Sequence, residues 1–269
     1  MEQHRGPIFI GGAGRSGTTL LRVMLDAHPG VYCGPELKVL PQIAQLYQGL
    51  TTHYAGVMQS FDNSPADVQL LFRELIEGLL ANSLRRAGKP RWAEKTPHNI
   101  TVMLPLGAIF PDARFLHLIR DGRDVVCSLV TMDWMKAGTD KKVDYVQNIG
   151  SAARYWRNIV QAARQQAAHP SLAGRVLEVR YEALVADPEG TLRQVLQFVD
   201  EPWDAAVLSY HQKSREHEPT ESSTQQANRP IYDKAVGRWR TDMTYNDKVA
   251  FKVEAGDLLK ELGYVREKW

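Results

Sequence analysis

The residues best suited to chemistry near the start of the chain form a glycine-rich loop that could hold a phosphate. Residues 7–21 read PIFIGGAGRSGTTLL, so four glycines lie between an apolar run and an apolar helical pattern. Glycines let the backbone approach an anion closely, and the N–H groups of a helix's first turn point at it. The loop adds a cation and three hydroxyl donors, which are Arg15, Ser16, Thr18 and Thr19. This stretch therefore predicts an anion site, although an ordinary strand-to-helix turn has the same outline.

The spacing within this loop differs from two common phosphate-binding motifs. A nucleoside triphosphatase loop needs a lysine directly after its last glycine, whereas Thr18 follows Gly17 and the cation stands earlier, as Arg15. Residues 12–17 match G-x-G-x-x-G, but the next strand-like segment ends with no acidic residue placed for a ribose. Both a triphosphatase loop and a dinucleotide site are therefore disfavoured.

A second charged group directly follows the apolar run 114–119, which predicts a buried strand. Arg120 stands where a magnesium-binding nucleotidase would have an aspartate, and Ser128 comes two helical turns later. The planar guanidinium of arginine bonds phosphate bidentately, so the pair suits a bare phosphate monoester. Taken alone, residues 120–124 would instead be a surface cluster of ion pairs.

The first loop resembles the phosphate-binding loop of a protein family whose substrate carries two anionic groups. Residues 14–19 are similar to the 5′-phosphosulfate loop of the sulfotransferases, which use 3′-phosphoadenosine 5′-phosphosulfate (PAPS). The longer run from Arg15 through Asp26-Ala27-His28-Pro29 to Glu36 resembles the tyrosylprotein sulfotransferases and many bacterial relatives. This resemblance extends from about residue 7 to 240. It implies PAPS as co-substrate, no metal ion, and a 5′-phosphosulfate contact from Arg15, Ser16, Gly17, Thr18 and Thr19.

The resemblance also implies contacts to the rest of the nucleotide. Arg120 and Ser128 match the arginine and serine that grip the 3′-phosphate of PAPS, and Arg238 replaces a lysine at the same phosphate. Tyr181 matches a tyrosine that touches the nucleotide. Ser223 matches a serine near the oxygen that bridges phosphate and sulfate.

Four residues are expected to act in the transfer itself: Glu36, Lys95, Arg15 and Ser223. Glu36 matches the proposed general base, although a glutamate in the first turn of a helix is also favoured by the helix dipole. Lys95 resembles the lysine that holds the bridging oxygen, where it would stabilise charge on the leaving phosphate. It could also be a solvated lysine paired with Glu94. His98 is the second choice for base, because cytosolic sulfotransferases use a histidine directly after Lys-Thr.

The elements that must position these residues alternate between short apolar strands and helical patterns. Such alternation predicts an α/β fold with a central parallel sheet flanked by helices, and the resemblance implies the P-loop-like sulfotransferase fold. Ligands on such sheets bind beyond the carboxyl ends of the strands, where the glycine loop, Lys95 and Arg120 are all expected. Strands are expected at 7–10, 31–33, 114–119 and 175–181, and a further strand begins at 91. Helices are expected at 18–27, 64–86, 143–168 and 188–199. A further helix is expected to begin at 34, and two others to end at about 109 and 262.

Composition limits the organisation and the partners. The chain has 269 residues, 43% of them hydrophobic and 24% charged, so we expect one globular sulfotransferase domain over 1–269. Its net charge of +2 gives no reason to expect a nucleic-acid partner. Residues 213–229 are polar and predict a mobile lid that orders over bound cofactor. A homodimer is left open.

Cysteine usage and hydropathy bear on the compartment. Cys33 and Cys127 are the only cysteines, so free thiols and a cytoplasmic location are expected. No signal peptide is recognisable, and no apolar run is long enough to span a membrane, so no membrane partner is expected.

The sequence leaves the chemical identity of the acceptor open. The resemblance implies a phenol, such as the tyrosine of a peptide or a small molecule. The tyrosylprotein enzymes, however, have an acidic pair and Thr-Arg where this chain has residues 35–38, which many relatives acting on a carbohydrate, lipid or polyketide alcohol share in outline. Two rivals from other classes are an ATP- and magnesium-dependent kinase and a nucleotide-binding module without catalysis.

Overall fold

The centre of the molecule is a five-stranded, all-parallel sheet with the spatial order β2-β3-β1-β4-β5. The computed structural model describes residues 5–136, 138–213, 229–231 and 234–265. The predicted α/β class with a central parallel sheet is confirmed. The strands are β1 (Ile8–Gly12), β2 (Val31–Cys33), β3 (Arg91–Lys95), β4 (Arg114–Ile119) and β5 (Val176–Arg180).

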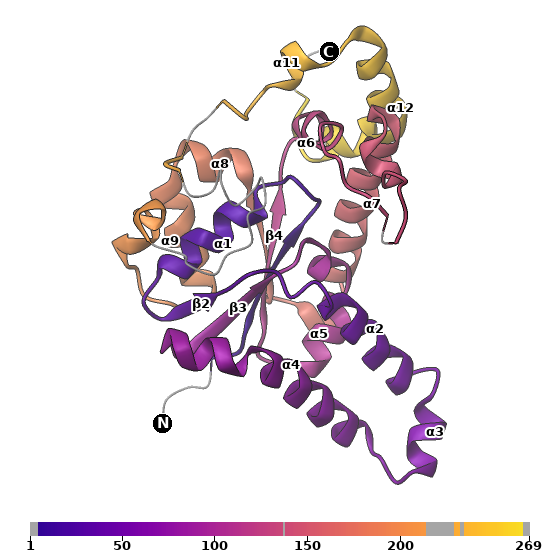
Figure 1. Ribbon diagram of the computed structural model, residues 1–269, viewed down its shortest axis with the longest axis vertical. Coiled ribbons are helices and arrows are strands. Elements are labelled where there is room, and N and C mark those ends of the chain that lie inside the picture. The colour runs from indigo at the N-terminus through magenta and orange to yellow at the C-terminus, as the bar shows by residue number, and fades with distance from the viewer. Residues whose placement is uncertain (1–4, 137, 214–228, 232–233, 266–269) are drawn as a thin grey trace.

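Alternate residues of β1 face two different helical layers, because side chains on a strand point to opposite faces in turn. Ile8 and Ile10 belong to the core on one face, and Phe9 packs on the other face against Phe115. Figure 1 shows α1, α8 and α9 on the first side and α5 and α7 on the second. Their bounds are α1 Thr18–Ala27, α5 Met103–Ile109, α7 Ile149–Ala167, α8 Tyr181–Ala186 and α9 Pro188–Phe198.

Helices α2, α3 and α4 extend away from the sheet at the lower right of Figure 1. The predicted helix at 64–86 is confirmed as α4, which begins after the capping box of Ser64. It buries Val68, Phe72 and Ile76, whereas Leu71 is 61% exposed. The remaining helices are α2 Leu40–Thr51, α3 Ala55–Ser60, α4 Pro65–Ala87, α6 Gly122–Leu129, α11 Trp239–Asp242 and α12 Tyr245–Glu261.

Two predicted helix starts are wrong. The helix expected from residue 34 begins only at Leu40, because the N–H groups of Leu37 and Lys38 bond to side chains of the β3 region instead of entering a helix. The helix expected over 143–168 begins at Ile149, because Asn148 caps it by accepting from the N–H of Ser151.

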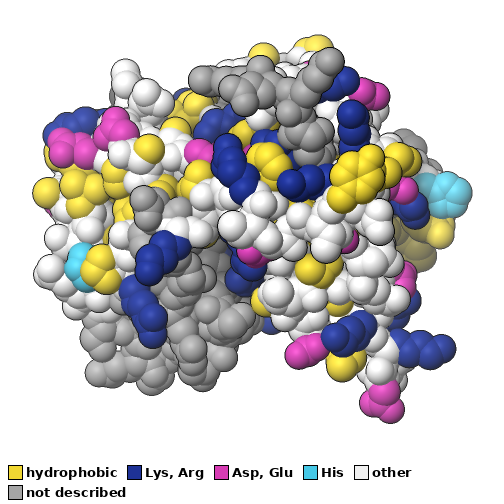
Figure 2. All heavy atoms as spheres, turned by 90° about the horizontal axis from the view of Figure 1, so that it is seen from above, with side chains coloured by type: hydrophobic (Ala, Val, Ile, Leu, Met, Phe, Trp, Pro, Cys, Tyr) yellow, Lys and Arg dark blue, Asp and Glu magenta, His cyan; other side chains and the backbone are white. Residues whose placement is uncertain are grey.

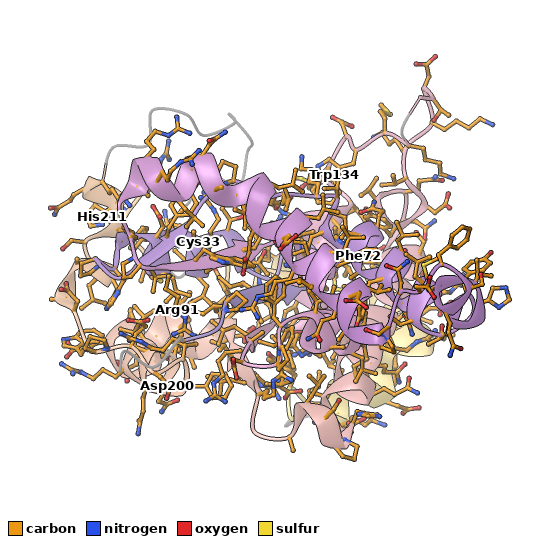
Figure 3. The ribbon with its side chains drawn as sticks, turned by 90° about the horizontal axis from the view of Figure 1, so that it is seen from below. Cys33, Phe72, Arg91, Trp134, Asp200 and His211 are labelled. Atoms are coloured by element: carbon orange, nitrogen blue, oxygen red, sulfur yellow. The ribbon has the colours of Figure 1, made fainter. Side chains whose placement is uncertain are left out.

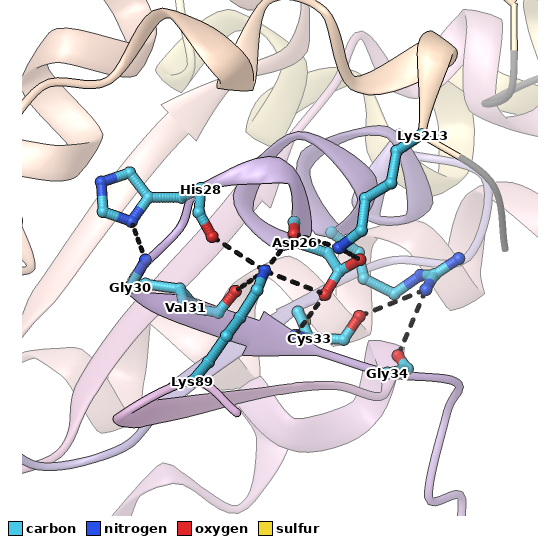
Figure 4. A network of polar contacts seen from close by, with 9 residues as sticks. Asp26, His28, Gly30, Val31, Cys33, Gly34, Lys89 and Lys213 are labelled. Carbon is cyan, nitrogen blue, oxygen red and sulfur yellow. Dashed lines mark hydrogen bonds and ion pairs between the residues drawn. The ribbon is translucent and has the colours of Figure 1, made fainter. Parts of the chain in front are cut away.

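The carboxyl end of α1 is fixed by a buried network drawn in Figure 4. The Nζ of Lys89 donates to the carbonyl oxygens of Asp26, His28 and Val31, at 2.5, 2.8 and 2.7 Å. A cation at this position complements the negative end of the helix dipole. At the same, amino end of the strands, seen from below in Figure 3, the Nε of Arg91 donates to the Gly6 carbonyl oxygen over 2.6 Å.

Two expectations concern residues that the structure does not describe. Most of the expected lid, 214–228, lies outside the described residues, and so does Ser223. Next to that segment, the hydroxyl of Tyr210 donates to the Arg229 carbonyl oxygen over 2.8 Å. In the described parts of the chain, no helix is both long and apolar enough to cross a lipid bilayer.

Candidate functional site

A cavity of about 940 Å³ opens at the carboxyl ends of the central strands. Seen from the side to which the strands point, this face carries Lys and Arg side chains next to hydrophobic ones (Figure 2). Ser16 and Lys95 are not among the described lining residues, but both lie directly beside it. The predicted residues that line it are Arg15, Gly17, Thr18, Thr19, Glu36, His98, Arg120, Ser128, Tyr181 and Arg238.

The glycine loop after β1 has the shape of an anion cradle. Arg15 and Gly17 both have left-handed backbones, with φ of 70° and 93°. Gly17 is the N-cap of α1 and no side chain caps this end, so the first-turn N–H groups face the cavity mouth. A Cβ at Gly17 would lie 2.4 Å from the ring of Tyr181, so only glycine fits. Ser16 Oγ is buried and has no hydrogen-bond partner among the described residues.

The second motif meets this loop directly. Arg15 Nε donates to Ser128 Oγ over 3.0 Å, and Arg120 Nη1 donates to the Arg15 carbonyl oxygen over 3.0 Å. The Arg120 guanidinium also lies 4.6 Å from the ring centre of Tyr181. Its Nε is buried and, within the described residues, unpartnered. The two motifs therefore form one cationic surface with a buried polar atom left over in each.

The segment before α11 is bound to the second motif. Asp124 in α6 accepts from the N–H groups of Gly237 and Trp239, at 2.7 and 3.0 Å. Arg120 donates to the Ala235 carbonyl oxygen. Burial raises the pKa of Asp124, while these backbone bonds oppose the shift. This docking brings Arg238 to the cavity, where its Nε bonds to Asp242 over 2.7 Å.

A carboxylate and a lysine form an ion pair at the carboxyl end of β3. Glu36 and Lys95 make a direct ion pair, and Lys95 Nζ also bonds to Thr19 Oγ1 over 3.3 Å. The alternative that Lys95 pairs with Glu94 is wrong. Successive strand residues point to opposite faces, and Glu94 accepts from the N–H of Leu37 instead.

The cavity that Glu36 lines also has an aromatic wall that sequence reasoning did not find. Tyr145 and Tyr155 stack with ring centres 4.1 Å apart, and Trp134 meets Tyr145 edge-on at 6.3 Å. The hydroxyl of Tyr155 accepts from the N–H of Gly14 over 3.1 Å, so the wall reaches the glycine loop. We call Trp134, Tyr145 and Tyr155 the aromatic wall.

His98 lies next to this wall, with its ring centre 6.1 Å from that of Tyr155. Burial lowers its pKa, and the nearby Glu36 carboxylate only partly opposes this. Burial also raises the pKa of Tyr155, so both rings are neutral at neutral pH. The aromatic wall comes from a loop, the short 3₁₀ helix Asp144–Val146 and α7, so no periodic signal could have joined its members.

The described residues contain no group of three or more His, Cys, Asp or Glu side chains that could hold a metal ion. The acidic residues nearest the anion loop are already engaged. Glu36 pairs with Lys95, and Asp124 holds the backbone of residues 237–239. Cations, hydroxyls, aromatic rings and the Glu36 carboxylate line the described cavity.

Comparisons with known proteins agree with this geometry. Residues 7–205 match the profile of the sulfotransferase family. The protein-tyrosine sulfotransferase of Drosophila melanogaster is 31% identical over 274 residues, which cover 96% of this chain and 51% of that protein. The chain thus spans about half the length of this relative.

Two solved structures share the fold. The sulfotransferase domain of the Synechococcus PCC 7002 olefin synthase superposes with a TM-score of 0.69 at 23% identity, covering 98% of this chain and 96% of that chain. Mouse sulfotransferase SULT7A1, complexed with PAP, superposes with a TM-score of 0.55 at 14% identity, covering 96% and 89%. The predicted P-loop-like sulfotransferase fold is confirmed by these similarities.

Proposed function

The chain belongs to the sulfotransferase family, and we propose that it moves a sulfuryl group from PAPS to the hydroxyl of an acceptor. The observation that carries this proposal is the meeting of two anion motifs beside an ion pair. Arg15 bonds to Ser128 over 3.0 Å, and the same cavity contains Glu36, which pairs with Lys95. A nucleotide with phosphate on both sides of its ribose would give each motif one anion.

The unpartnered polar atoms support this fit. Buried polar atoms are normally hydrogen-bonded, yet within the described residues Ser16 Oγ and Arg120 Nε are not. One belongs to each motif, as expected if each motif receives an anionic group. The mouse neighbour contains PAP, the product that PAPS leaves. We assign Arg15, Ser16, Gly17, Thr18 and Thr19 to the 5′-phosphosulfate, Arg120, Ser128 and Arg238 to the 3′-phosphate, and Tyr181 to the nucleotide.

The residues at the end of β3 divide the transfer into two tasks. PAPS supplies a sulfuryl group that is already activated by its bond to phosphate. Glu36 takes the proton of the attacking hydroxyl as the acceptor oxygen bonds to sulfur. The bond from sulfur to the bridging oxygen breaks, and that oxygen keeps the electron pair. Lys95 and Arg15 stabilise the resulting charge, and we assign Ser223, outside the described residues, to the same task.

The aromatic wall favours a phenol among the acceptors considered. Aromatic rings stack on one another or meet edge-on, and such pairs add to the effect of burial. Trp134 and Tyr155 lie against the glycine loop: a Cβ at Gly14 would lie 3.4 Å from the Tyr155 hydroxyl and 3.7 Å from the Trp134 ring. A phenol on this wall would lie in the cavity that Glu36 also lines. Tyrosine in a peptide and small phenols share this chemistry.

We also infer that residues 1–269 act as one catalytic domain. Arg238 lines the cavity, and α12 packs with α6 and α7 in one core cluster, so the C-terminal region belongs to the same unit as the anion motifs. The two rivals from other classes are disfavoured by residues of the same site. Thr18 stands where the loop of a kinase would have its lysine. A nucleotide-binding module without catalysis would not need the Glu36–Lys95 pair.

Thermal shift and radiolabel transfer test the proposal. PAP should raise the melting temperature without magnesium, whereas ADP and ATP should not, with or without it. Labelled PAPS should then give a labelled product with a phenol or a tyrosine peptide more readily than with sugars or alkyl alcohols. Stabilisation by ATP only in the presence of magnesium would contradict the proposal, and so would PAP binding without transfer to any acceptor.

A further inference from the structure

The segment that carries Glu36 has no regular secondary structure of its own. Residues 34–39 connect β2 to α2 as an irregular turn. Lys38 has a φ of 51°, a left-handed conformation that residues other than glycine rarely adopt. Arg22 Nη1 bonds to the Cys33 and Gly34 carbonyl oxygens, both at 3.3 Å, and so holds the start of this segment. Contacts from elsewhere must therefore fix the direction of the Glu36 side chain.

Three consecutive residues at the end of β3 bind three consecutive residues of this segment. One contact is an ion pair between side chains. The other two are bonds from backbone N–H groups to side-chain oxygens, at 2.9 and 3.2 Å. The pairs are Glu36 with Lys95, Leu37 with Glu94, and Lys38 with Thr96.

Glu94 is the centre of this arrangement. Its side chain is buried, and its carboxylate accepts from Thr96 Oγ1 at 2.9 Å and Asn99 Nδ2 at 2.5 Å, besides the N–H of Leu37. A buried carboxylate is costly unless it is hydrogen-bonded, and here three donors meet it. One carboxylate thus binds the segment directly and also orients Thr96, which holds Lys38.

We propose that Glu94 is a positioning residue for the general base. It fixes the main chain next to Glu36, so that the Glu36 carboxylate stays beside Lys95 and reaches the acceptor hydroxyl. This inference rests on the proposed function, in which Glu36 is the base. The Glu94 carboxylate already accepts three hydrogen bonds from the chain itself, so it acts through the segment and not on a ligand.

Glu94→Met keeps most of the side-chain volume and removes every acceptor. We expect kcat to fall about 30–100-fold, since a displacement of about 1 Å can cost 10²-fold in rate. PAP affinity should stay within about 3-fold, because the anion motifs do not contact Glu94. The amides of Leu37 and Lys38 should exchange hydrogen faster than in the wild type, a readout that needs no activity.

Glu94→Gln is the conservative variant, which should keep the rate that Glu94→Met loses. Its carbonyl oxygen can still accept from Leu37, and its NH₂ can donate to Asn99 Oδ1, which has no partner among the described residues, once that amide turns. We expect kcat within about 5-fold of the wild type. A loss as large as that of Glu94→Met would contradict a role through these hydrogen bonds.

A double variant separates positioning from a general loss of stability. In a Glu36→Ala background, Glu94→Met should not lower the residual rate further, because the group that it positions is gone. If Glu94→Met lowers that rate by its full factor, or leaves wild-type kcat unchanged, the proposal is overturned. If Glu94→Met does not fold, Thr96→Val makes the test, and a folded variant with unchanged kcat overturns the proposal equally. Absence of transfer by the wild type would instead refute the proposed function, while hydrogen exchange would still report on Glu94.

Discussion

Arg15 and Ser128 are joined by a hydrogen bond of 3.0 Å although 113 positions separate them in the chain. Arg15 belongs to the loop after β1, and Ser128 to the helix that follows β4. These strands are neighbours in the sheet and parallel, so both turns lie at the same edge. Two motifs that are each ambiguous alone thereby meet in one cavity, which suits the proposed nucleotide with two anionic groups.

Arg120→Lys should weaken PAP binding without unfolding the protein. Lysine keeps the charge but loses the planar group that bonds to the Arg15 carbonyl oxygen and would bond to phosphate bidentately. A hydrogen bond to a charged group contributes about 1.5–3 kcal/mol, so the dissociation constant should rise about 10–100-fold. Isothermal titration calorimetry with PAP measures this change.

Arg114→Lys is the matched control, because Arg114 begins the same strand at its opposite end and bonds to Asp200 over 3.0 Å. Its PAP affinity should equal that of the wild type. Equal losses in the two variants would mean that Arg120 acts on the fold and not on the nucleotide.

Glu36→Ala should keep PAP affinity and lose turnover. A positioned general base typically contributes about 10²–10⁴-fold, so kcat should fall within that range. Steady-state kinetics with a phenol and calorimetry with PAP measure the two effects separately. His98→Ala is the comparison, since His98 also lines the cavity. A larger loss for His98→Ala than for Glu36→Ala would transfer the base role to the histidine.

The parts of the site that sequence reasoning found are those that depend on local structure. The loop at 14–19 and the turn at Arg120 each follow a buried strand directly, so type and spacing were enough to place them. The sheet itself was predictable because β1 and β4 are short and mostly apolar, although β4 includes His117. The strand order β2-β3-β1-β4-β5 was not predicted, because alternation of strands and helices indicates parallel pairing but not which strands are neighbours.

The parts that were missed depend on contacts between distant segments. The helix expected from residue 34 begins only at Leu40, because Glu94 and Thr96 bind N–H groups that an earlier start would have used. The aromatic wall was invisible for a related reason. Trp134, Tyr145 and Tyr155 come from different elements and share no spacing, so only the folded chain brings them together.

Trp134→Ala should impair use of a phenol without changing nucleotide binding. The indole forms the outer part of the aromatic wall and is 37% exposed, so its loss removes stacking area but little core packing. Aromatic pairs contribute about 0.5–1.5 kcal/mol, so KM for the phenol should rise about 2–12-fold. Tyr54→Ala, an exposed aromatic residue that does not line the cavity, should leave KM unchanged. An unchanged KM in Trp134→Ala would exclude the wall as the acceptor surface.

Gly17→Ala should lose both stability and PAP affinity. Its φ of 93° and the nearby Tyr181 ring both exclude a side chain. Strain of this kind costs about 1–3 kcal/mol, which thermal unfolding measures. Gly88→Ala is a close control, because Gly88 has a φ of 62° and a Cβ there would meet no described atom within 4 Å. It should lose stability but bind PAP normally, and a similar loss of PAP affinity in both variants would argue against a special role of the loop.

His117 should make the fold sensitive to mild acid. It lies in β4 with no exposed surface and, among the described residues, no hydrogen-bond partner. Burial lowers its pKa from 6.5 to about 3, and the charges of Arg164 and Arg180 act in the same direction. Above pH 6.5 the ring is neutral in both states. Below pH 6.5 the imidazole is protonated in the unfolded chain but stays neutral in the folded chain. The free energy of unfolding therefore decreases as the pH is lowered from 6.5 to about 3.

The slope of this loss is about 1.4 kcal/mol per pH unit, so the free energy of unfolding should drop by about 3 kcal/mol between pH 6.5 and 4 on account of this group. His117→Leu removes the titrating ring and should flatten that part of the curve in urea titrations at a series of pH values. His53→Gln changes an exposed histidine and should keep the wild-type slope. Because Glu178 lies 3.9 Å from the imidazole, its carboxylate would favour the protonated ring. If His117→Leu shows the same slope as the wild type, that carboxylate offsets burial and His117 is not the acid-sensitive group.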